Sequence, residues 1–112
     1  MKKIVLLFLA VALTFSVVGC AKEAVVTPKI GVAIYKFDDT FMSYVRNQIQ
    51  SAANGKILLS VQDSQYDQPK QNDQVDQFLA EGDTALAINM VDPSAVSVII
   101  GNAKATNFPL YQ

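Results

Sequence analysis

Three apolar stretches, each followed by a helical pattern, constrain the fold of this chain more than any other sequence feature. The apolar stretches are residues 29–35, 56–62 and 84–90. Apolar residues at helical spacing follow them over about 41–53, 69–81 and 93–105. A near-continuous apolar run is what a strand buried on both faces requires, and strands that alternate with helices build parallel sheets. The sequence therefore predicts an α/β fold: a Rossmann-like parallel sheet with helices on both faces.

The first 19 residues have the features of a secretory signal peptide. Lys2 and Lys3 give it a positive start, and the apolar core at 4–13 is short. A helix that spans a bilayer needs about 20 apolar residues, so this core does not predict a membrane-spanning helix. Residues 1–19 are therefore predicted to direct export to the periplasm or the extracytoplasmic face of the membrane.

Residues 17–20, V-V-G-C, resemble the lipobox of bacterial lipoproteins. This resemblance implies cleavage before Cys20 and lipidation of that residue, and several acyl chains on one residue give stable anchoring. Residues 20–28 then form a tether anchored in the membrane by lipid. An ordinary signal peptide followed by an incidental cysteine is the alternative.

The composition counts against catalysis and against nucleic-acid binding. The 112 residues include no histidine and one cysteine, so the commonest general base is missing and one thiol cannot form a zinc site. No G-x-G-x-x-G, P-loop or G-x-S-x-G motif occurs. The net charge of −1 offers no basic surface for nucleic acid. We expect a protein that is not an enzyme, with no metal or other cofactor in this segment.

The turn after the first strand carries the candidate binding residues. Asp38 and Asp39 follow the strand at 29–35, and Phe41 stands at the start of the next helix. Ligands of open α/β sheets sit at the carboxyl ends of the strands. A carboxylate accepts hydroxyl protons, and an aromatic ring can cover the apolar face of a sugar. From the residues alone, helix capping by the acidic pair and core packing of Phe41 remain open alternatives.

Three collinear segments resemble a known family of bacterial binding proteins. They read KIGVAIYKFDDTFMSYVR (29–46), DSQYDQPKQNDQVDQFLAEG (63–82) and ALAINMVDP (85–93). They are similar to the N-terminal lobe of galactose/glucose-binding proteins, the type 1 periplasmic binding proteins that serve galactose/methyl galactoside ABC transporters. The resemblance implies two lobes that close on one monosaccharide. Residues 29–112 would form a truncated N-terminal sugar-binding lobe, with a fourth strand opening at 110–112.

The resemblance also implies roles for individual residues. Asp39 would accept hydrogen bonds from sugar hydroxyls, Phe41 would stack on the sugar ring, and Asp38 would be structural. From its position at the end of a strand, we expect Asn89 to hold the following turn by local hydrogen bonds, with a hinge or water-mediated role as the alternative. Thr40 departs from the family, which often has asparagine there. The family's calcium loop would lie in the C-terminal lobe, outside this segment.

These observations predict a substrate-binding lipoprotein of an ABC importer for carbohydrate. Its ligand would be D-galactose, D-glucose or methyl galactoside, and its partners the transporter permease and a chemoreceptor, with the protein a monomer. A binding protein for another sugar, such as ribose, is one alternative. A receiver-like or flavodoxin-like signalling domain is another, because such domains also carry an acidic pair after the first strand, although an export signal counts against it.

Overall fold

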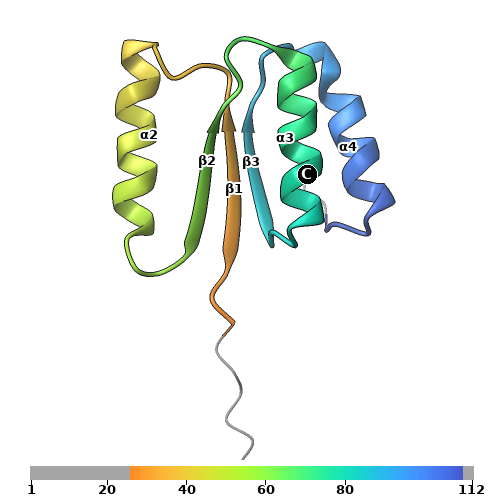
Figure 1. Cartoon of the computed structure of the whole chain (residues 1–112), viewed down its shortest axis with the longest axis horizontal. Helices are drawn as coiled ribbons and strands as arrows, with labels where there is room; N and C mark the ends of the chain where they lie inside the picture. Colours follow the sequence, from red (N-terminus) through yellow and green to blue (C-terminus); the bar gives the residue numbers. More distant parts are fainter. Residues whose placement is uncertain (1–25, 110–112) are drawn as a thin grey trace, which may run out of the picture.

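The computed structural model describes residues 26–109, in which three parallel strands alternate with helices (Figure 1). The strands are β1 (Lys29–Ile34), β2 (Leu58–Asp63) and β3 (Ala85–Asn89). The helices are α2 (Thr40–Ala53), α3 (Gln68–Ala80) and α4 (Val96–Ala105), with the short 3₁₀ turn η1 (Pro93–Ala95) before α4. The predicted order of strands and helices is confirmed. The second strand begins two residues later than predicted, and the last helix begins with a 3₁₀ turn.

The sheet has the order β2-β1-β3, so β1 is the central strand. Ile34 at the end of β1 is opposite Asp63 of β2 and Asn89 of β3, which brings the three carboxyl ends level with one another. Helix α2 lies on one side of the sheet, and α3 and α4 lie on the other (Figure 1). With right-handed crossovers, the face that a helix covers depends on the direction in which the chain moves across the sheet. The chain moves from β1 to β2 through α2 and then back past β1 to β3 through α3, so these two helices lie on opposite faces. The prediction of helices on both faces is confirmed.

One core cluster fills the space between α2 and the sheet. Val32, Ile34 and Met42 are buried there, with partly buried apolar neighbours from α2 and β2. Helical spacing in the sequence predicts that Ala52 faces this core, but Ala52 is exposed and Ala53 is buried. The prediction was therefore one residue out at the end of the helix, where the last turn brings Ala53 toward the sheet.

Helix α3 buries a more polar face than its sequence predicted. The expected stripe was Val75, Phe78 and Leu79, and the first two are fully buried while Leu79 is only half-buried. Gln71 and Gln74 share the buried face. A buried amide is tolerated when it is hydrogen-bonded, and both side chains are bonded at the ends of the strands.

Aspartates cap helices α2 and α3 and the 3₁₀ turn η1. Asp39 Oδ1 accepts from the Met42 N–H at 2.9 Å, and Asp67 Oδ1 accepts from the Lys70 N–H at 2.7 Å. Asp92 caps η1 in the same way. Each cap satisfies a backbone donor that has no partner inside the helix, which fixes where the helix begins.

Strand β3 lies at the outer edge of the sheet in the described part of the chain. Among residues 26–109 it pairs only with β1, and its side chains alternate between exposed and half-buried. The predicted fourth strand at 110–112 lies outside the described residues. The apolar composition of β3 therefore does not correspond to burial within residues 26–109.

A close approach of α3 to β1 generates a stability prediction. A Cβ atom at Gly31 would lie 2.5 Å from Cγ of Phe78 and 2.7 Å from Oδ2 of Asp83. Gly31→Ala should therefore lower the free energy of unfolding by about 1–3 kcal/mol, as overpacking of a core does. Urea unfolding followed by circular dichroism measures the change.

Gly101→Ala is the matched control, because nothing lies within 4 Å of a Cβ at this helical position. It should raise the free energy of unfolding by up to about 1 kcal/mol, since alanine is the better helix former. A Gly31→Ala variant as stable as the parent chain would contradict the packing described here.

Candidate functional site

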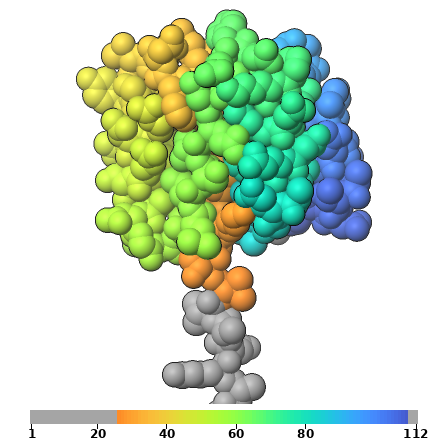
Figure 2. All heavy atoms as spheres, viewed as in Figure 1, coloured from red at the N-terminus to blue at the C-terminus, as the bar shows by residue number. Residues whose placement is uncertain are grey.

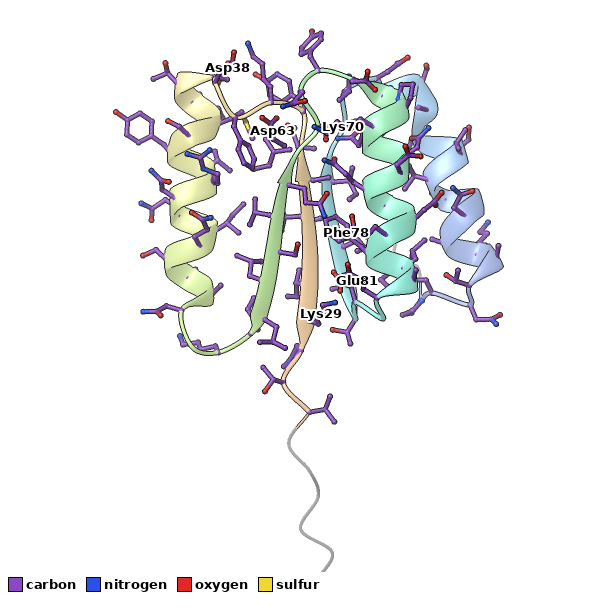
Figure 3. The ribbon with its side chains drawn as sticks, viewed as in Figure 1. Lys29, Asp38, Asp63, Lys70, Phe78 and Glu81 are labelled. Atoms are coloured by element: carbon purple, nitrogen blue, oxygen red, sulfur yellow. The ribbon has the colours of Figure 1, made fainter. Side chains whose placement is uncertain are left out.

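The loops that follow the three strands meet at one edge of the sheet. The level strand ends place the turn after β1 beside the loops after β2 and β3. Figure 3 shows Asp38 and Asp63 at this edge, whereas Lys29 and Glu81 lie at the opposite end of the sheet. The edge is the place where ligands bind in open α/β sheets, and we call it the ligand edge.

An open hollow of about 580 Å³ lies at the ligand edge between the first two loops. Its lining residues are Lys36, Asp38, Asp63, Gln65 and Tyr66. Its volume is within the range of about 300–1,000 Å³ that is usual for small-molecule sites. Carboxylate and amide groups next to an aromatic ring can bind a polar molecule that also has an apolar face.

Asp39, the predicted hydroxyl acceptor, is the N-cap of α2. The backbone N–H of Met42 and, next, the phenol of Tyr35 hold the pKa of Asp39 below its ordinary value. The carboxylate is therefore ionised at neutral pH and acts only as an acceptor. A carboxylate has about four acceptor positions, so the capping bond is compatible with hydrogen bonds from a ligand.

Phe41, the predicted stacking residue, lies in the first turn of α2 with 71% of its surface exposed. The alternative that this ring packs in the core is wrong. The side chain of Asp38 is 83% accessible, and its carboxylate lies 3.4 Å from the ammonium of Lys36. Asp39 and Phe41 themselves are not among the residues that line the hollow.

The loop after β2 contributes residues that sequence reasoning did not select. Gln65 and Tyr66 adopt left-handed backbone conformations, with φ of 53° and 60°. Asp63, the last residue of β2, stabilises the first of these by accepting a hydrogen bond from the Gln65 N–H at 2.9 Å. Tyr66 donates its N–H to the Tyr35 carbonyl at 2.7 Å. Consecutive left-handed residues are rare outside glycine and tend to occur at functional sites.

Two tyrosine rings meet beside this loop. The ring centroids of Tyr35 and Tyr66 are 5.8 Å apart in an edge-to-face arrangement. Tyr66 is still 67% exposed, so much of its ring is available to a ligand or to another surface. A tyrosine three residues after a polar strand end was the sequence signal that could have identified it.

The prediction for Asn89 is wrong. Its Oδ1 accepts a hydrogen bond at 3.4 Å from the N–H of Tyr35, the residue after the neighbouring strand β1, and does not hold the turn that follows Asn89. The turn is held instead by α3, because the N–H groups of Val91 and Asp92 donate to glutamine side chains of that helix. Asn89 therefore joins the ends of β1 and β3.

Clusters of metal-ligating side chains and membrane-spanning helices were both sought among the described residues. Between residues 26 and 109, no three histidine, cysteine, aspartate or glutamate residues are grouped to hold a metal. No helix in the same range has the length and apolar character needed to cross a bilayer. Cys20, the predicted lipidation site, lies outside the described residues.

Known proteins resemble this chain in sequence and in fold. It is 54% identical over 84 residues to the D-galactose/methyl-galactoside binding periplasmic protein MglB of Haemophilus influenzae, covering 73% of this chain and 25% of that protein. It is 31% identical over 83 residues to a putative rhizopine-binding protein of Rhizobium meliloti, covering 72% and 27%. The chain thus spans about a quarter of the length of these curated relatives.

A solved structure gives the same result for the fold. An ABC transporter solute binding protein from Bacillus halodurans C-125, determined with bound myo-inositol, superimposes with a TM-score of 0.65 at 25% identity. The match covers 74% of this chain and 29% of that protein.

Finally, the sequence model of the periplasmic binding protein domain matches residues 30–111. With its parallel sheet, its ligand edge and this match over most of its length, the chain belongs to the periplasmic binding protein domain family, which is a family of binding domains and not of enzymes.

Proposed function

We propose that this chain forms part of the sugar-binding protein of an ABC importer, with D-galactose, D-glucose or methyl galactoside as ligand. The observation that carries this proposal is the 54% identity to a protein named for binding D-galactose and methyl galactoside. The family assignment also removes support from the signalling-domain alternative, which rested on the acidic pair alone.

The geometry at the ligand edge suits a monosaccharide. Asp39 is ionised and accepts hydrogen bonds, and Phe41 presents an exposed ring two residues later. A sugar offers hydroxyl donors at its rim and C–H groups on its faces, which match these two side chains. Closure of a second domain on the bound sugar would report occupancy to the permease, and to a chemoreceptor in the same way.

Substitution of Phe41 tests the proposed stacking contact. In the full-length gene product, Phe41→Ala should weaken galactose binding by at least about tenfold, the equivalent of a 1.4 kcal/mol loss. Isothermal titration with galactose, glucose, ribose and myo-inositol measures the affinity. Tyr44→Ala is the matched control, because Tyr44 is an equally exposed aromatic on the same helix, three residues away. Equal affinity in the two variants would contradict the stacking role.

Substitution of Asp39 separates capping from binding. Asparagine is as good an N-cap as aspartate, so Asp39→Asn should unfold at nearly the same urea concentration as the parent chain. It lacks the charged acceptor, and its galactose affinity should fall at least about tenfold, since hydrogen bonds to charged groups are the stronger ones. A variant with normal stability and normal affinity would show that Asp39 is only a cap.

We also propose that the protein is anchored by lipid on the extracytoplasmic side of the membrane. The V-V-G-C sequence at 17–20 supports this location. The first described residues, from Val26, emerge at the end of the molecule opposite the ligand edge (Figure 2). A tether that leaves there would keep the ligand edge away from an anchoring membrane.

Substitution of Cys20 tests the anchor. In cell fractionation, Cys20→Ser should move the protein from the membrane fraction to the soluble fraction, because the acyl chains can no longer be attached. Mass spectrometry of the mature parent protein should show an acylated N-terminal cysteine. An unmodified thiol at Cys20 would contradict the proposal and leave an ordinary signal peptide.

A further inference from the structure

Three glutamines spaced three residues apart on α3 bond to the loops of the ligand edge. They are Gln68, Gln71 and Gln74, and we call them the glutamine row. The middle one is fully buried, with 0% of its surface accessible. Fully buried positions are usually occupied by apolar residues, and an amide buried there costs free energy unless it is hydrogen-bonded. The placement of these amides therefore calls for an explanation other than core packing.

The side chain of Gln71 uses both its donor and its acceptor groups. Its Nε2 donates to the Ser64 hydroxyl and to the Asn89 carbonyl, each at 3.0 Å. Its Oε1 accepts from the N–H of Val91, also at 3.0 Å. One side chain therefore joins the loop after β2 to the end of β3 and the turn behind it.

The other two members of the glutamine row, Gln74 and Gln68, bond to the end of β2 and to the turn after β3, respectively. Gln74 donates to the Asp63 carbonyl and accepts from the Ser64 hydroxyl, both at 2.9 Å. Gln68 accepts from the N–H of Asp92 at 2.7 Å. Because β2 and β3 are separated by β1, no ladder hydrogen bonds connect their ends, and the glutamine row makes the connection instead.

The glutamine row is also connected to the end of the central strand β1, through Asn89. Asn89, whose carbonyl is bonded to Gln71, accepts with its own side chain from the Tyr35 N–H at the start of the turn that carries Asp39. We propose that Gln71, supported by Gln68 and Gln74, is a positioning residue that sets the spacing of the three loops around the bound sugar. This inference rests on the proposed sugar-binding function.

The test compares two substitutions on the buried face of α3 in the full-length gene product. Gln71→Met keeps the length of the side chain and removes its hydrogen bonds, so galactose affinity should fall at least about tenfold. Amide hydrogen exchange at Val91 should become faster at the same time, since its acceptor is lost. Phe78→Leu is the control, because this buried residue packs against Gly31, away from the loops. It should lower the urea midpoint while affinity stays within about twofold of the parent.

Parent-like affinity of Gln71→Met would overturn the inference, and so would an equal loss of affinity in Phe78→Leu at a matched loss of stability. If Gln71→Met fails to fold, Gln68→Ala decides. Gln68 is only half-buried, and its substitution removes the hydrogen bond that the Asp92 N–H donates to it. Galactose binding by Gln68→Ala should therefore be about threefold weaker than that of the parent, and unchanged binding would overturn the inference. A parent protein that binds none of the tested sugars would overturn the proposed function, and the inference with it.

Discussion

The fold depends on the burial of one strand from every side. β1 pairs with β2 and β3 along its two edges, while Val32 and Ile34 pack toward α2 and Gly31 lies against Phe78 of α3. A strand in this position cannot shift by one residue without turning its apolar face to the wrong layer. Its register therefore holds the three strand ends level, and the ligand edge exists because these ends coincide.

Much of the fold could be predicted because its determinants are local. Apolar runs, helical spacing and capping residues such as Asp39, Asp67 and Asp92 act over a few neighbouring positions, and each gave an element close to the right place. The burial of the α3 glutamines could not be predicted. Glutamine is usually exposed to solvent, and only its hydrogen-bond partners elsewhere in the chain show that it is buried. Gln71 is buried because of Asn89 and Val91, which lie far from it in the sequence.

The candidate site was predictable to a different degree for each residue. Asp39 and Phe41 became candidates through their position after the first strand, and the family resemblance then favoured binding over capping and core packing. The structure removes the core-packing alternative for Phe41, because the ring is exposed. Capping by Asp39 is observed, and the remaining acceptor positions of its carboxylate are compatible with the proposed role in binding. Tyr66 was missed because no glycine marks its left-handed backbone. The position is stabilised instead by the hydrogen bond from the Tyr66 N–H to the Tyr35 carbonyl.

The outer edge of β3 has a consequence for handling the protein. Within residues 26–109, its sequence ALAIN pairs on one side only and contains no charge, no proline and no bulge. Charges, prolines and bulges are the devices by which proteins prevent strand edges from joining one another. A preparation limited to residues 26–109 should therefore reach its solubility limit through edge-to-edge association of folded molecules, so colloidal behaviour, and not unfolding, would restrict its working concentration.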